Sequence, residues 1–152
     1  MNKTKHYIFI LFLFFLSSCG YKAVLNKQNY QFSIKVDTIN GDQKINSQII
    51  NNFEKLKENE KKYYLNLSSN KEKIVISKDL KGDPSIFELI INVNYTVKKE
   101  GEILINNKLN KKTTYNNITD KFELESYEKT IIDNLVSEIS DNIMLSISKI
   151  SE

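Results

Sequence analysis

Apolar and polar residues alternate with a period of two at the start of the predicted domain. Over residues 30–36 the apolar members are Tyr30, Phe32, Ile34 and Val36. A period of two is typical of a strand with one buried face. The pattern stops at Asn40-Gly41-Asp42, whose residue types favour a turn and offer a helix N-cap. The sequence therefore predicts a strand that leads directly into a helix.

Residues 45–56 change to a helical spacing of apolar positions. Ile45, Ile49, Phe53 and Leu56 follow this spacing, and the polar residues Ser47, Asn51 and Glu54 fall on the other side. Such spacing places the apolar side chains on one face, which predicts an amphipathic helix.

The middle of the chain returns to strand patterns. Tyr63, Leu65 and Leu67 alternate, a polar run covers residues 68–73, and an apolar run covers 74–76, which predicts one interrupted strand or two short ones. After a turn at residues 78–84, alternation over 87–97 gives the longest strand signal. Residues 98–102 predict a hairpin loop with Gly101 in a left-handed conformation. A return strand begins at Ile103 and fades over residues 111–115.

The last segment predicts a long helix from about Leu124. Its predicted core stripe is Ile131, Ile132, Leu135, Val136, Ile139, Ile143, Ile147 and Ile150. The polar face of this helix has no concentration of lysine, so we expect it to pack on a sheet rather than on a membrane surface. The order β-α-β-β-β-α predicts an α+β fold, a two-layer sandwich with two helices on one face of a sheet of about four strands.

The N-terminus predicts export and lipid anchoring. Lys3 and Lys5 precede an apolar run over residues 7–16, which is too short to span a bilayer and is typical of a cleaved signal peptide. The run ends in Leu16-Ser17-Ser18-Cys19, the pattern of a bacterial lipobox, and Cys19 is the only cysteine of the chain. We therefore predict a signal peptide over 1–18, a tether over 19–29 acylated at Cys19, and a single domain over 30–152.

Composition argues against an enzyme. The only histidine, His6, lies in the signal peptide, so the mature chain has no imidazole and no free thiol for nucleophilic catalysis or for a zinc site. Asp and Glu are interleaved with Lys, as on a solvated surface. Without Lys3 and Lys5, 20 of the 22 basic residues remain against 19 acidic ones, so net charge identifies no ligand. We expect no catalysis, no cofactor, no metal and no nucleic-acid partner.

Cys19-Gly20-Tyr21, the order of elements and the segment 87–97 together resemble the LptE family of LPS-assembly lipoproteins. The resemblance covers nearly the whole mature chain. It implies a lipoprotein on the periplasmic side of the outer membrane, held inside the large barrel LptD as plug and assembly partner, in contact with lipopolysaccharide. Gly20 after the acylated cysteine agrees with an outer-membrane destination.

Lysines near two predicted loops are the candidate ligand site. The turn before the long strand and the exit of the return strand must share one end of the sheet, which predicts that Lys78, Lys81 and Lys121 are neighbours. Lysines at loop ends can bind the phosphates of lipid A as mobile point charges. The basic lipid-binding positions of the LptE family fall in these loops, with Lys81 and Lys121 the nearest matches. Lys98 and Lys99 at the opposite hairpin are the alternative.

Two other functions stay open at this point. The chain fits an auxiliary lipoprotein of an ABC-type lipid transporter, which would bind an inner-membrane or periplasmic complex. It also fits a structural periplasmic lipoprotein without a lipid ligand.

Overall fold

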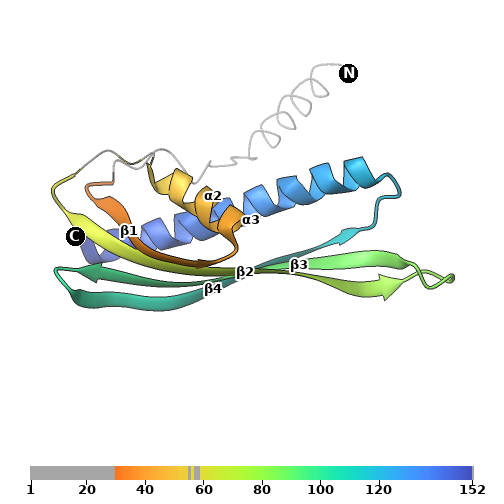
Figure 1. Ribbon diagram of the computed structural model, residues 1–152, viewed down its shortest axis with the longest axis horizontal. Helices are drawn as coiled ribbons and strands as arrows, with labels where there is room; N and C mark the ends of the chain where they lie inside the picture. Colours follow the sequence, from red (N-terminus) through yellow and green to blue (C-terminus); the bar gives the residue numbers. More distant parts are fainter. Residues whose placement is uncertain (1–29, 55, 57–58, 152) are drawn as a thin grey trace, which may run out of the picture.

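The elements follow one another in the predicted order in the computed structural model, which describes residues 30–54, 56 and 59–151 (Figure 1). They are β1 (Ser33–Gly41), α2 (Gln43–Glu54), β2 (Lys62–Lys78), β3 (Pro84–Lys99), β4 (Glu102–Asn116) and α3 (Lys121–Ser151). The predicted α+β class and the order β-α-β-β-β-α are confirmed. The signal peptide, Cys19 and the tether lie outside the described residues.

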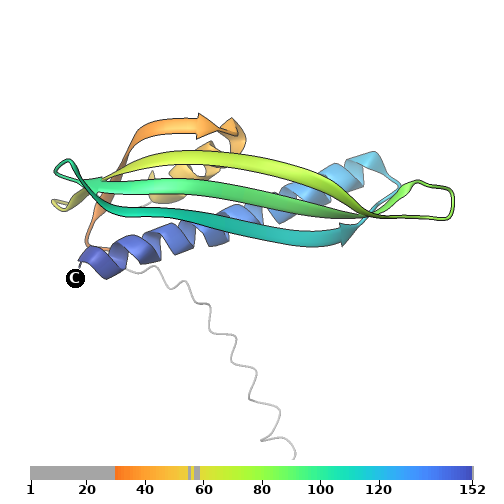
Figure 2. The same cartoon turned by 90° about the horizontal axis from the view of Figure 1, so that it is seen from below.

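The four strands form one open mixed sheet in the order β1-β2-β3-β4. β1 runs parallel to β2, whereas the β2–β3 and β3–β4 pairs are antiparallel. Both helices lie over one face of this sheet (Figure 1), and the other face carries neither of the described helices (Figure 2). The two-layer arrangement is the predicted one.

The core lies between the sheet and the two helices. Strand β3 supplies a continuous row of it, because every second side chain from Phe87 to Val97 is buried. Helix α3 covers this row with Leu135, Val136, Ile139, Ile143, Met144 and Ile147. Burial of apolar side chains at about 25 cal/mol per Å² is the main force that holds the two layers together.

Strand β2 is a single strand that changes character along its length. From Lys62 to Ser69 it pairs with β1 on one side and β3 on the other, and its alternate side chains are buried. From Asn70 to Lys78 it pairs with β3 only, and its side chains are exposed or partly exposed. We call β2 residues 62–69 with the strands beside them the near half of the sheet, and β2 residues 70–78 with their neighbours the far half.

Side-chain caps set the helix starts. The Asp42 carboxylate accepts the backbone N–H groups of Lys44 and Ile45 at 3.0 and 3.1 Å, as the sequence predicted for this turn. Asp120 accepts the N–H of Glu123 at 2.8 Å in the same way, so α3 starts at Lys121 and not near Leu124.

Two other details of the helix predictions were wrong. Helix α2 ends at Glu54, so Leu56 packs beside the core from outside the helix. Ile150 is 39 % exposed and does not belong to the core stripe, which instead includes the buried Ser140. The Ser140 hydroxyl donates to the Val136 carbonyl at 2.9 Å, which satisfies it inside the core.

The domain has two ends with different contents. The tether end holds the starts of β1 and β2, the β3–β4 hairpin and the end of α3, and the N–H of Ser33 donates to the Lys61 carbonyl there at 2.9 Å. Gly101 in this hairpin has the predicted left-handed φ of 87°. The turn end holds the β2–β3 turn, the end of β4 and the start of α3 (Figure 1). The predicted tether over residues 19–29 therefore joins the domain at the end opposite the β2–β3 turn.

Candidate functional site

The β2–β3 turn is a hydrogen-bonded loop organised by Asp79. The Asp79 carboxylate accepts the N–H groups of Lys81 and Asp83, each at 2.9 Å, and its backbone carbonyl accepts the N–H of Gly82 at 3.1 Å. Gly82 has a φ of 90°, which a residue with a side chain adopts only with strain. These bonds fix the turn so that it presents Leu80 and Lys81 to solvent, with Leu80 107 % exposed.

The three candidate lysines all stand at the turn end, so the shared end is confirmed, and their being neighbours stays a prediction. Lys78 closes β2, Lys81 lies in the turn, and Lys121 is the first residue of α3. The N–H of Asn117 donates to the Ser85 carbonyl at 2.8 Å, which joins the exit of β4 to the start of β3. Figure 1 shows the turn projecting beyond the start of α3. The lysines thus belong to two layers, Lys78 and Lys81 to the sheet and Lys121 to the helix.

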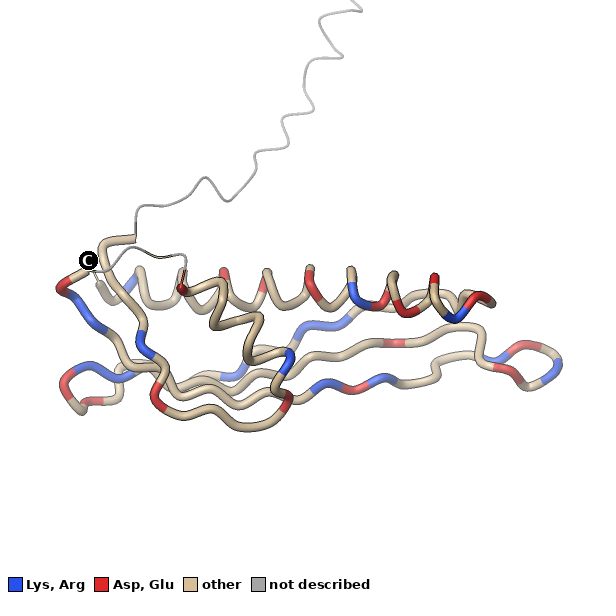
Figure 3. The backbone as a smooth tube through the Cα atoms, turned by 45° about the horizontal axis from the view of Figure 1, so that its top comes forward, with Lys and Arg blue, Asp and Glu red and all other residues tan. Residues whose placement is uncertain are grey.

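Acidic and apolar residues surround these lysines. Asp79, Asp83 and Asp120 are close to them in sequence, so charge of both signs occurs at this end (Figure 3). Phe122, next to Lys121, is 83 % exposed. Sequence reasoning named the lysines and missed the apolar neighbours, although each stands beside a candidate lysine in the chain.

A polar cluster inside the far half fixes α3 to the sheet. The ammonium group of Lys73 forms an ion pair with Glu128 of α3 and lies 4.1 Å from the centre of the Phe87 ring. The hydroxyl of Tyr115 donates to the same carboxylate oxygen of Glu128 at 2.7 Å. Such charge-assisted bonds are stronger than neutral ones, and Lys73 gains a cation–π contact as well.

The protonation of this cluster follows from its contacts. Burial raises the pKa of Glu128, but the hydrogen bonds from Lys73 and Tyr115 outweigh it, so the pKa of Glu128 lies below its ordinary value. Burial, and then the bond to the Glu128 carboxylate, raise the pKa of Tyr115. At neutral pH the cluster holds a carboxylate, an ammonium and a neutral phenol. This arrangement positions a helix and activates no nucleophile.

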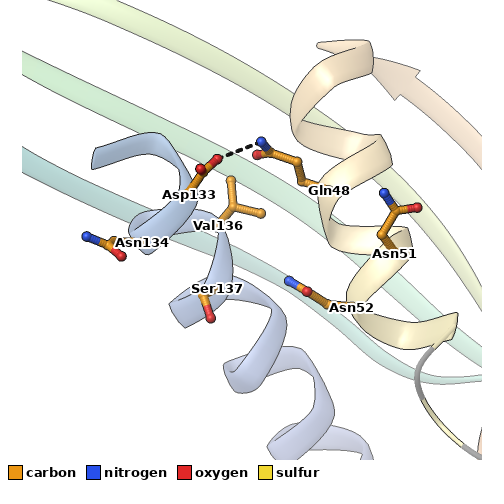
Figure 4. A pocket seen from close by; sticks show the side chains of 7 residues that line it. All are labelled: Gln48, Asn51, Asn52, Asp133, Asn134, Val136 and Ser137. Carbon is orange, nitrogen blue, oxygen red and sulfur yellow. Dashed lines mark hydrogen bonds between the residues drawn. The ribbon is translucent and has the colours of Figure 1, made fainter. Parts of the chain in front are cut away.

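A hollow lies between the two helices (Figure 4). It has a volume of about 420 Å³ and is lined by Gln48, Asn51, Asn52, Asp133, Asn134, Val136 and Ser137. The amide of Gln48 donates to the Asp133 carboxylate at 2.8 Å across the groove. Side-chain amides with a single carboxylate form hydrogen bonds, but they lack the paired acids that acid–base hydrolysis needs. Val136 belongs to the predicted core stripe, and the other lining residues are polar positions of the two predicted helices, for which the sequence predicted no site.

Among residues 30–54, 56 and 59–151, no group of three or more His, Cys, Asp or Glu side chains lies where it could hold a metal ion. None of the described helices is long and apolar enough to cross a membrane.

Comparisons with known sequences identify no relative. No protein-family model matches the chain. No curated protein sequence matches it significantly either.

Comparisons with solved structures place the fold among bacterial lipoproteins. The rare lipoprotein B of Shewanella oneidensis superposes with a TM-score of 0.57 and 14% identity, over 77% of this chain and 96% of that one. Lipoprotein B of Nitrosomonas europaea gives a TM-score of 0.58 and 11% identity, over 78% and 86% of the two chains. A minor lipoprotein of Acinetobacter baumannii gives 0.53 and 13% over 79% and 92%. At these identities the likeness establishes a shared fold, which spans nearly all of each neighbour.

Proposed function

We propose that this chain is a non-catalytic outer-membrane lipoprotein that works as an LptE-type partner of the LPS translocon. In this role it is anchored through Cys19, plugs and helps assemble the barrel LptD, and assists the insertion of lipopolysaccharide at the cell surface. One observation carries the proposal. In this sequence a lipobox is followed by a domain whose fold matches 96% of the Shewanella oneidensis lipoprotein B chain. The fold supplies the domain, and the lipobox supplies the anchor.

The elongated shape suggests how such a domain would work. β3 has 16 residues and α3 has 31, so each spans about 50 Å between the tether end and the turn end. An acylated Cys19 would hold the tether end beside the anchoring leaflet. Lys78 and Lys81 would then reach a lipid that lies away from that leaflet, inside or beyond a partner barrel.

The chemistry of the turn end fits a phosphorylated amphiphile. Lys81 and Lys121 offer ammonium groups for phosphates. Exposed Leu80 precedes Lys81 in the chain, and exposed Phe122 follows Lys121. Lipid A combines phosphates with acyl chains. The two kinds of side chain therefore support lipopolysaccharide as the ligand.

Co-purification tests the partner. A tagged full-length chain, extracted in mild detergent from the outer membrane of its own bacterium, should retain a large barrel that mass spectrometry identifies as LptD. A Cys19→Ala variant, which cannot be acylated, serves as the control for membrane placement. Absence of any outer-membrane barrel from the wild-type preparation would reject the proposed function.

Charge reversal tests the ligand site. The double variant Lys81→Glu, Lys121→Glu should bind lipopolysaccharide at least about tenfold more weakly at fixed moderate salt, because attraction to two phosphates becomes repulsion. The matched control is Lys98→Glu, Lys99→Glu at the tether end, which should bind like the wild type. Circular dichroism and urea unfolding should show that both variants fold. Equal binding by all three proteins would remove these lysines from the site.

A further inference from the structure

The far half of β2 has one open edge. β1 pairs with β2 only as far as Gly41 opposite Ser69, whereas β2 continues to Lys78. From Asn70 onward the strand has β3 on one side, and no other described strand pairs with it on the other side. An open edge presents a row of backbone N–H and C=O groups that can pair with a further strand.

The edge is open because β1 leaves the sheet at a fixed residue. Gly41 has a φ of 88°, and the next residue, Asp42, caps helix α2. The N–H of Asp42 donates to the Ser69 carbonyl at 3.0 Å, and the Ser69 hydroxyl donates to the Asp42 carbonyl at 3.1 Å. The chain therefore leaves the sheet at Ser69 through a left-handed glycine and two hydrogen bonds, and β1 cannot extend along the rest of β2.

The open edge has an apolar centre. Ile74, Val75 and Ile76 are 41 %, 41 % and 53 % exposed, and β-branched residues are the ones that strand pairing favours. The outer edge strand on the other side of the sheet, β4, instead carries three lysines over its middle and end, Lys108, Lys111 and Lys112. Lysine on an edge strand is a usual protection against unwanted pairing. The β2 edge lacks that protection at its centre.

The charges at this edge select the kind of strand that fits. Lys71 and Lys78 are exposed at its two ends. The only acid between them, Glu72, accepts a hydrogen bond from Asn70 at 2.8 Å. Lys73 is paired with Glu128 of α3, so the edge presents Lys71 and Lys78 against the single acid Glu72. An added strand with acidic residues at its ends therefore meets complementary charge.

We propose that the open edge of β2, Asn70–Lys78, binds an extended segment of another protein by strand addition. The segment has β-branched apolar residues at its centre and acidic residues at its ends. The β2–β3 register is regular up to Val75 and shifts between Val75 and Ser77, so the added strand pairs with Asn70–Val75. The paired stretch Asn70–Val75 does not include Lys78, Lys81 or Lys121 of the candidate ligand site, and the test does not depend on the identity of the barrel.

A synthetic peptide tests the proposal directly. The probe is the capped peptide Thr-Glu-Val-Thr-Val-Glu-Thr, added to the isotope-labelled mature chain and followed by amide hydrogen exchange. Amides of residues 70–75 should exchange at least about tenfold more slowly with the peptide bound. The matched control peptide has the same side chains with alternate backbone nitrogens methylated, which removes its hydrogen-bond donors. It should give no protection, because strand addition depends on backbone bonds.

Variants locate the binding surface. Ile74→Lys should weaken binding of the probe peptide about tenfold, because it removes an apolar contact with the centre of the peptide and would bury a charged group there. Ile103→Lys, at a 57 % exposed position near the start of β4, should bind like the wild type. Equal affinity for the two peptides, or protection confined to β1 or β4, would overturn the proposal.

A second copy of this chain is the competing occupant of the edge. Sedimentation of the mature chain without peptide should show a monomer. A dimer that Ile74→Lys converts to a monomer would assign the edge to self-pairing and would also overturn the proposal. A failed pull-down of the barrel would leave these results unaffected, so the two proposals fail separately.

Discussion

The near and far halves of the sheet are built by different means. The near half has four strands, and both helices lie over it (Figure 1), with side chains such as Leu65 and Ile139 fully buried. The far half has three strands, and α3 is the helix that contacts it through the cluster of Lys73, Tyr115 and Glu128. Apolar burial under two helices holds the first half together. In the second half, buried side chains of β3 such as Leu89 and Ile91 are joined by a few polar contacts.

This difference gives the near half a role in stability and the far half a role in interaction. Side chains buried between the two layers of the near half, such as Leu65, have no access to a partner. The far half keeps the exposed residues of the β2 edge and of the turn end. Regions with fewer buried apolar contacts also open locally at lower free energy. We therefore expect ligand and partner contacts to concentrate in the far half.

Truncation of one side chain in each half is the strongest test of the contrast. Leu65→Ala removes a side chain that is 0% exposed and should lower the free energy of unfolding by about 3–4 kcal/mol. Val75→Ala, on the same strand at 41 % exposure, should cost less than about 1 kcal/mol. Urea unfolding followed by circular dichroism measures both values. Similar losses would mean that the two halves are equally important for stability.

The junction between the halves depends on one glycine. A Cβ atom on Gly41 would lie 1.9 Å from the Ser69 carbonyl oxygen, in a backbone with a φ of 88°. Gly41→Ala should therefore lower the free energy of unfolding by about 3 kcal/mol, through clash and backbone strain together. Gly82→Ala is the matched control, because its φ is similar but nothing lies within 4 Å, and it should cost about 1 kcal/mol. If Gly41→Ala costs no more than Gly82→Ala, the close contact at the junction is wrong.

The polar cluster should give a smaller effect confined to the far half. Glu128→Gln loses the ion pair with Lys73 and weakens the bond from Tyr115, which should cost about 1–2 kcal/mol. Glu125→Gln, at an exposed position of the same helix, should change stability by less than about 0.5 kcal/mol. Hydrogen exchange should show faster opening around the start of α3 in Glu128→Gln alone. Uniform destabilisation of both halves would contradict a local role.

Acid should affect two carboxyl groups in opposite directions. The pKa of Glu128 is lowered in the folded state, so its stabilising contribution is complete above its unfolded-state pKa and is lost as the pH falls through the folded value. Burial, and then the charge of Glu138, raise the pKa of Asp141, so charged Asp141 costs stability at neutral pH and the cost disappears as the pH falls through the raised pKa.

The same denaturation measured between about pH 7 and about pH 3 checks both signs. Asp141→Asn should raise stability at neutral pH and have no effect at the acidic limit. Glu128→Gln should lower it at neutral pH, with a smaller loss in acid. A stabilising Glu128→Gln or a destabilising Asp141→Asn at neutral pH would contradict the assigned pKa directions.

Most of the fold follows from periodicity, and the exceptions have one cause. The sequence predicted the strand at 87–97 because β3 is buried along its entire length. It left β2 as one interrupted strand or two, because alternation requires cover on one face and that cover ends where β1 leaves the sheet at Ser69. The loss of the pattern at residues 70–73 marks a change of neighbours, with no break in the backbone.

The candidate site was predicted in position and only partly in composition. Connectivity alone required Lys78, Lys81 and Lys121 to share one end of the sheet, and they do. That they belong to two layers depends on how far the β2–β3 turn projects beyond α3, which the sequence does not state. The ion pair of Lys73 with Glu128 joins residues 55 positions apart, so no local pattern announces it.

The sequence by itself determined the order of elements, the α+β class and the predicted anchor at Cys19. Each of these depends on neighbours in the chain, through the period of the apolar pattern or the spacing of the lipobox. Only the tertiary structure decided where β1 stops beside β2, which side chains of β2 stay exposed, and which residues meet at Glu128. Those features depend on contacts between segments far apart in the chain, and local periodicity carries no information about such contacts.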